Sequence, residues 1–320
     1  MINILLAFIF LHSAIPLRET IDVNGDVLYI MPGKDSVYSV VYRNLEYYLV
    51  KLSPCDKEKK LSLHGGHHRV MWEWNENIFI ISNNCIDVYS HDLDMIKKIS
   101  LAELGEGDEY NVKNLSMLGE TKLIYGYDHS YLFKEGHIGE IGNRVEFCGF
   151  PIYKEDEKIH FGRNLLSKRF KKIEDVLREA FFVKGVFLSI GNQLYDLNGD
   201  LINSLNESDY IIACAGLDGG GYLIEKTKGL FLIDKDGVEA NVKFGGNMSS
   251  IIGRFDDGTI LVQSEKDCLI IIGKSVGDIV RWKSSNQVFC PVIFEKNIYY
   301  YDGKSICVIS KEKQGKIFNQ

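Results

Sequence analysis

The chain has 320 residues, of which 45% are hydrophobic and 25% are charged, and its formal net charge is −7. This composition is that of a folded globular protein and excludes a largely disordered chain. The small excess of acidic residues, 44 against 37 basic ones, disfavours a nucleic-acid-binding protein, which usually carries a net basic balance or a basic face.

The chain begins with an apolar run, MINILLAFIFLHSA, which ends in small residues before Ile15 and Pro16. Its length is typical of a signal peptide and falls short of the ~20 apolar residues that span a bilayer. We therefore expect residues 1–14 to be a signal peptide and residues 15–320 to form one mature domain, without membrane insertion, in the lumen of the secretory pathway or outside the cell. No Lys or Arg precedes the run, and the alternative is an apolar first strand of a cytoplasmic protein.

Short apolar runs separated by polar turns fill almost all of the remaining chain. A first strand, TIDVNGD, ends at an Asn24-Gly25 turn, and the later runs recur in groups of four. The second run of each group begins at Val37, Ile78, Leu123, Ile159, Val186, Tyr222, Ile260 and Ile298. These starts lie 27 to 45 residues apart, and strand-only units of about 40 residues are typical of a β-propeller.

The repeats predict an all-β fold, a single β-propeller of four-stranded antiparallel blades. Eight blades are favoured over seven because eight hairpins can be counted. The strand near Thr20 to Val23 is expected to close the ring by pairing with the last blade. One group is irregular, since residues 165–180 show helical spacing at Ile173, Val176 and Leu177, which predicts a helix of one or two turns.

One repeat carries a family resemblance. In Gly277 to Ser310, a strand with Gly277 and Trp282 is followed by the pattern xPVxxxxxIYxxDGxxxxxI. The residues that match this pattern are Pro291, Val292, Ile298, Tyr299, Asp302, Gly303 and Ile309. This segment resembles the quinoprotein-type (PQQ-like) propeller repeat, which implies the propeller fold. Quinone-dependent dehydrogenases of that type have an adjacent cysteine pair that is missing here, so no cofactor is expected.

The densest charge lies in the irregular group, where Arg163, Lys168, Arg169, Lys171 and Lys172 are candidate binding residues. They could form a partner-binding or polyanion-binding patch, or the solvated face of the inserted helix. Three histidines, His64, His67 and His68, lack an acidic or thiolate residue at ligand spacing, so no metal site is expected.

The function that these patterns favour is a non-enzymatic scaffold for protein–protein interaction, acting as a monomer within a complex. No catalytic residues are assigned, because nearly every residue belongs to a strand or a tight turn and few long loops remain for a catalytic shell. Two alternatives stay open. One is an enzyme or a propeller that binds a sugar or another small ligand in the funnel on the ring axis, and the other is a polyanion binder using residues 163–178.

Overall fold

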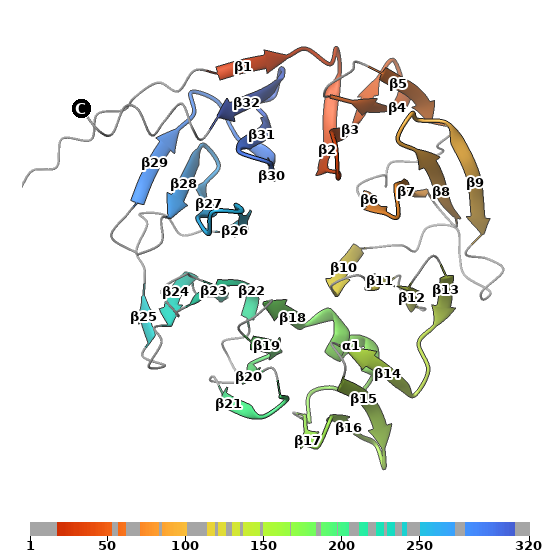
Figure 1. Ribbon diagram of the computed structural model, residues 1–320, viewed down its shortest axis with the longest axis vertical. Helices are drawn as coiled ribbons and strands as arrows, with labels where there is room; N and C mark the ends of the chain where they lie inside the picture. The colour runs from red at the N-terminus through yellow and green to blue at the C-terminus, as the bar shows by residue number, and fades with distance from the viewer. Residues whose placement is uncertain are drawn as a thin grey trace, which may run out of the picture.

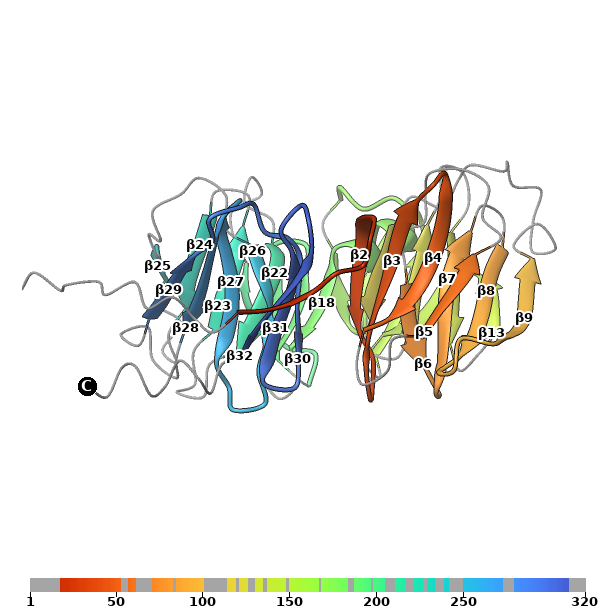
Figure 2. The same cartoon turned by 90° about the horizontal axis from the view of Figure 1, so that it is seen from above.

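The computed structural model describes the following residues: 18–52, 57–61, 71–82, 85–100, 114–118, 121–125, 130–134, 137–147, 150–166, 168–183, 187–196, 198–204, 211–216, 222–226, 229–233, 239–241, 250–272 and 279–310. Their strands form a ring of four-stranded antiparallel sheets, as Figure 1 shows. Figure 2 shows the same ring edge-on, with the strands running across its thickness. The predicted β-propeller of four-stranded antiparallel blades is confirmed.

Eight such sheets are present in the described part of the chain, and each is built from strands that follow one another in sequence, except where β1 joins the last. Sheets 1 and 2 consist of β2 (Asp26–Pro32), β3 (Val37–Arg43), β4 (Glu46–Lys51) and β5 (Lys57–Leu61), and of β6 (Met71–Trp74), β7 (Asn77–Ser82), β8 (Cys85–Ser90) and β9 (Met95–Ser100). Sheets 3 and 4 consist of β10 (Asn114–Leu118), β11 (Thr121–Tyr125), β12 (Ser130–Lys134) and β13 (His137–Glu140), and of β14 (Arg144–Phe147), β15 (Phe150–Glu155), β16 (Lys158–Phe161) and β17 (Asn164–Leu165).

The helix α1 (Ile173–Arg178) precedes the second half of the ring. Sheets 5 and 6 consist of β18 (Ala180–Val183), β19 (Phe187–Ile190), β20 (Gln193–Tyr195) and β21 (Leu201–Ser204), and of β22 (Ile211–Gly216), β23 (Tyr222–Lys226), β24 (Gly229–Ile233) and β25 (Glu239–Asn241). Sheet 7 consists of β26 (Ser250–Arg254), β27 (Ile260–Glu265), β28 (Cys268–Ile272) and β29 (Ile279–Lys283), and sheet 8 of β30 (Phe289–Phe294), β31 (Asn297–Tyr301), β32 (Ile306–Ser310) and β1 (Arg18–Ile21).

In each sheet we label the four strands A to D from the centre of the ring outward, so that β2 to β5 are strands A to D of sheet 1. Because every sheet follows this order, equivalent turns of different sheets lie at the same end of the ring. We call the end with the A–B and C–D turns the AB face. The opposite end, with the B–C turns and the connections between sheets, is the BC face.

The ring closes through its first described strand. In sheet 8, β1 occupies the outermost position, and it pairs with β32 from Arg18 opposite Ile309 to Ile21 opposite Ile306. The predicted closure is therefore confirmed, with the strand starting two residues earlier than expected.

The core consists of the interfaces between neighbouring sheets. One cluster joins sheets 1 and 2 through residues such as Tyr38, Leu49, Trp72 and Phe79, and others join sheets 8 and 1, 6 and 7, and 7 and 8. Because each sheet has two apolar faces, it can bury both only between two neighbours, as expected for a propeller.

Sheet 4 is set back from the ring. Strand β10 of sheet 3 contacts β18 of sheet 5, while β14 lies farther from the centre, beside α1 (Figure 1). The buried residues Ile173, Val176 and Leu177 of α1 pack with Phe161 and Tyr195 in one cluster between sheets 4 and 5. The predicted helix is confirmed, but the predicted count of eight blades needs a correction here, because the eight sheets are not eight equivalent blades.

The strand assignment in sheet 4 is also corrected. The repeat assigns Ile159 to the second run of its group, which leaves the preceding segment VEFCGFPIY as one strand, but the structure has two strands there, β14 and β15. Ile159 therefore belongs to the third strand of its sheet, β16, and the short interval in the repeat comes partly from this shift. The last strand, β17, has only two residues, so the chain leaves the sheet early and continues to α1.

Candidate functional site

The predicted basic residues lie in two places. Arg163 lies in the turn between β16 and β17, and the other four lie in the connection between β17 and α1. All five residues are exposed, and the sequence from Lys158 to Lys172 contains no acidic residue. The four residues 168, 169, 171 and 172 form what we call the basic connection.

Arg169 differs from its neighbours because it has structural contacts. Its guanidinium forms an ion pair with Glu179, just after α1, and lies 4.8 Å from the centre of the Phe170 ring. Gly191, with a positive φ of +59°, leaves room for this guanidinium, because a Cβ there would collide with it. Arg169 thus links the end of α1 to sheet 5.

The remaining cations of this region point to solvent. Lys168, Lys171 and Lys172 make no ion pair with any residue that the structure describes, and the same is true of Arg163. Between them, the buried side chains of Phe170 and Leu166 hold the connection against the core. The lysines are therefore presented on a fixed backbone and not on a free loop.

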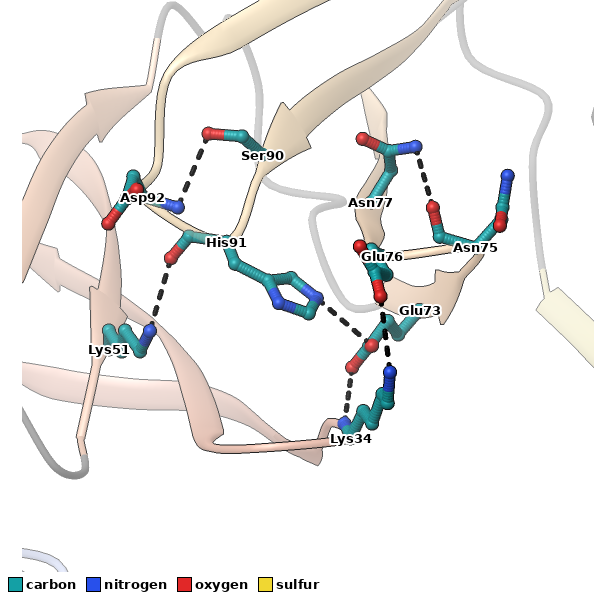
Figure 3. Close-up of polar contacts among 9 residues, drawn as sticks. All are labelled: Lys34, Lys51, Glu73, Asn75, Glu76, Asn77, Ser90, His91 and Asp92. Carbon is teal, nitrogen blue, oxygen red and sulfur yellow. Dashed lines mark hydrogen bonds and ion pairs between the residues drawn. The ribbon is translucent and has the colours of Figure 1, made fainter.

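A second polar group lies at the AB face, where sheets 1 and 2 meet (Figure 3). The carboxylate of Glu73 on β6 accepts a hydrogen bond from the backbone N–H of Lys34 (2.6 Å), and its other oxygen lies 3.0 Å from Nε2 of His91. The side chain of Glu73 is only 12% exposed, and that of His91 is 22% exposed. Lys34 also forms an ion pair with Glu76 at 3.1 Å, which is far more exposed. We call these four residues the first junction.

A buried tyrosine lies behind the first junction. The ring centre of Tyr38 is 6.2 Å from that of His91, and its hydroxyl has no hydrogen-bond partner among the described residues. Burial first, and the negative charge of Glu73 second, raise the pKa of Tyr38 to about 12. The phenol is therefore protonated at neutral pH.

The first junction resembles a catalytic pair only in part. A carboxylate that orients an imidazole is a common arrangement for general base catalysis. However, both oxygens of Glu73 have partners on the protein, and the nearby Ser90 hydroxyl accepts hydrogen bonds from the backbone N–H groups of Asp92 and Asp94. The geometry is that of a structural polar contact that connects two sheets.

Sequence reasoning missed the first junction. Glu73 lies 39 residues from Lys34 and 18 from His91, and no local motif connects these positions. A polar residue inside the apolar run MWEW is the one signal that could have drawn attention to it.

A pocket of about 390 Å³ lies between the A strands of sheets 1, 7 and 8 at the AB face. Its walls include Pro32, Ile252 and Ile293, and its charged groups are Arg254, Asp256 and Glu295. These groups come from two of the three sheets, Arg254 and Asp256 from sheet 7 and Glu295 from sheet 8.

The described residues contain no group of three or more His, Cys, Asp or Glu side chains that could hold a metal ion. The three histidines at 64, 67 and 68 lie outside these residues. In the same part of the chain, no helix is long and apolar enough to cross a membrane. Cys85, Cys268, Cys290 and Cys307, which lie within the described ranges, are not joined in disulfides there.

Comparison with known proteins shows the fold. No protein-family model and no curated protein sequence matches the chain. Among solved structures, the computationally designed protein Ika8 superposes with a TM-score of 0.56 at 9% identity, over 90% of this chain and 97% of that one.

Two natural proteins are similar to the same degree. Virginiamycin B lyase from Staphylococcus aureus has a TM-score of 0.54 at 10% identity, over 92% of this chain and 98% of that one. PorZ, a bacterial surface component of the type-IX secretion system of Porphyromonas gingivalis, has a TM-score of 0.53 at 10% identity, over 92% of this chain but only 38% of that one. At these identities the likeness shows the β-propeller fold alone.

Proposed function

We propose that this propeller is a non-enzymatic scaffold that binds an acidic protein partner through the basic connection and Arg163. The observation that carries the proposal is the position of Lys168, Lys171 and Lys172, which are exposed and free of ion pairs with any described residue. They lie at an irregular sector of the ring, beside the sheet that is set back. Interruptions of a repeat commonly map to a binding face.

The charge of the rest of the chain favours a local, complementary contact. With a net charge of −7, the whole molecule does not attract polyanions at long range. Screening in physiological salt limits the effect of the lysines to about 8 Å. A partner with carboxylates placed to match these lysines fits this short range, and such matching determines specificity more than affinity.

Two further predictions accompany this proposal. The likeness of Gly277 to Ser310 to the quinoprotein-type repeat would make the chain a propeller of that type, without identifying a subfamily. The apolar run at residues 1–14 would place it in the secretory pathway, and that run lies outside the described residues.

The test compares affinity capture by the wild-type protein with capture by the triple variant Lys168→Ala, Lys171→Ala, Lys172→Ala. Arg169 is left unchanged because its ion pair and its contact with Phe170 hold the fold. We expect at least a tenfold weaker association with the partner that the wild-type protein captures, and an unchanged circular dichroism spectrum.

The matched control removes three other exposed cations, in Lys59→Ala, Lys97→Ala, Arg281→Ala, which lie on outer strands of sheets 1, 2 and 7. It should bind like the wild-type protein. If the two triple variants bind equally well and Arg254→Ala in the axial pocket abolishes binding, the proposal is wrong and the small-ligand alternative replaces it.

A further inference from the structure

An open groove of about 540 Å³ lies on the BC face, between sheets 7 and 8. Three segments line it: the turn between β27 and β28, the connection between β29 and β30, and the turn between β31 and β32. It lies on other sheets than the basic connection, so an inference about it does not depend on the proposed function.

The groove is built by hydrogen bonds between its three segments. The connection is attached to the first turn by the backbone N–H of Ser284, which donates to the carbonyl of Asp267 (2.7 Å), and by that of Val288, which donates to the carbonyl of Lys266 (2.6 Å). It is attached to the other turn by the Asn286 amide, which donates to Asp302 at 3.2 Å. The walls are therefore fixed before any ligand binds, which lowers the entropic cost of binding.

The acidic residues of the groove already have partners within the protein. The carboxylate of Asp302, in a residue only 7% exposed, accepts hydrogen bonds from the backbone N–H groups of Lys304 and Ser305. Asp267 forms an ion pair with Lys283 at 3.4 Å.

The basic residues of the groove do not have such partners. Lys266 and Lys304, on opposite turns, are exposed and make no ion pair with any residue in the described ranges. Two walls of the groove therefore carry an exposed ammonium group that is not held in an ion pair within the described residues, while the carboxylate of Asp302 is turned to backbone N–H groups and to Asn286.

Between these lysines the groove offers an apolar surface and polar groups. Phe289, the first residue of β30, is 42% exposed, although large aromatic side chains are usually buried. Beside it, the Asn286 side chain donates an amide N–H to Asp302 and keeps its carbonyl oxygen as an acceptor. The exposed Gln287 side chain offers both its NH₂ donor and its carbonyl acceptor. Carboxamides of this kind can pair with the N–H and C=O groups of a peptide backbone.

We propose that this groove binds an extended acidic peptide segment, with one apolar side chain on Phe289 and carboxylates at Lys266 and Lys304. Aromatic residues, Phe included, are enriched at the centre of protein interfaces, where polar groups form the rim. The two lysines supply the charge complementarity, and the open shape accommodates a chain that enters and leaves.

The test is a selection from a displayed library of random heptapeptides on two immobilised proteins, the wild type and the double variant Lys266→Glu, Lys304→Glu. The wild-type protein should enrich peptides with an apolar residue between acidic ones, and the charge-reversed variant should enrich Lys and Arg in place of Asp and Glu. Binding of one selected acidic peptide, measured by fluorescence anisotropy, should weaken at least tenfold in Phe289→Ser.

The matched control is Lys59→Glu, Lys97→Glu, which makes the same change of net charge on the outer strands β5 and β9. It should select the same peptides as the wild-type protein. The proposal is overturned if the wild-type protein enriches no peptide, or if the charge-reversed groove selects the same sequences as the wild type. Circular dichroism establishes that each variant is folded.

Discussion

Replacing Glu73 with alanine removes the carboxylate that joins sheets 1 and 2 at the first junction. Two hydrogen bonds are lost, one from the backbone N–H of Lys34 and one from the imidazole of His91. A hydrogen bond to a charged group contributes about 1.5–3 kcal/mol. Because His91 is 22% exposed and can turn to water, part of its contribution is recovered. We therefore expect the free energy of unfolding to fall by about 2–4 kcal/mol.

Urea denaturation followed by circular dichroism measures this change, provided that the dependence of the free energy on urea concentration stays constant. Glu76→Ala is the matched control, because Glu76 also pairs with Lys34 across the same junction but is 71% exposed. An exposed ion pair contributes little, so this variant should unfold like the wild-type protein. Glu73→Gln should lie between the two, since the carboxamide keeps one acceptor.

Unfolding of Glu73→Ala and Glu76→Ala at the same urea concentration would contradict this expectation. That result would mean that burial does not distinguish the two carboxylates, and that the first junction does not hold the sheets together.

Two other predictions concern the same junction. Burial raises the pKa of Tyr38 from 10.0 to about 12, so the stability that its protonated phenol contributes is present below pH 10 and is lost as the pH rises towards 12. Between pH 8 and pH 11, the free energy of unfolding of Tyr38→Phe should therefore rise by about 1.4 kcal/mol relative to that of the wild-type protein, as measured by urea unfolding. A difference that does not change with pH would contradict this. Gly33→Ala should lower the free energy of unfolding by about 1–3 kcal/mol in the same assay, because the added Cβ would collide with the Glu73 carboxylate and lie 2.7 Å from the Tyr38 ring. If the losses of Gly33→Ala and Glu73→Ala simply add in the double variant, the collision with Glu73 is not the cause.

The sequence predicted the fold because a propeller repeats one local pattern. Runs such as NIYYYDG and KSICVIS combine apolar strands with a turn that starts at an aspartate, and Asp302 indeed accepts the backbone N–H groups of Lys304 and Ser305. The helix was predictable for the same reason, since the spacing of Ile173, Val176 and Leu177 is local. Such features are readable because the residues that determine them are neighbours in the chain.

Sheet 4 shows where local reading fails. The segment VEFCGFPIY has no Asn-Gly or Asp-Gly pair to mark a turn, so the end of β14 and the start of β15 are hidden in one apolar run. The set-back position of the sheet depends on the contact between β10 and β18, which belong to different sheets. A contact of this kind leaves no pattern in either strand.

The polar contacts between sheets could not be predicted for a related reason. Glu73 and Glu76 are both polar residues near a turn, yet the side chain of Glu73 is 12% exposed and that of Glu76 is 71% exposed, and Glu73 accepts a hydrogen bond from a backbone N–H of sheet 1. Glu225 on β23 repeats the device between sheets 6 and 7, where it accepts a hydrogen bond from the backbone N–H of Ile251 at 2.9 Å, and burial raises the pKa of its carboxyl. In both cases a carboxylate of one sheet accepts a hydrogen bond from the main chain of a neighbouring sheet, the preceding one for Glu73 and the following one for Glu225. Close packing of the apolar side chains already resists sliding of one sheet along another, and a carboxylate that loses its partner when the sheets slide adds a cost of about 1–3 kcal/mol. These contacts therefore set the position of neighbouring sheets, a role that exists only once the ring has formed.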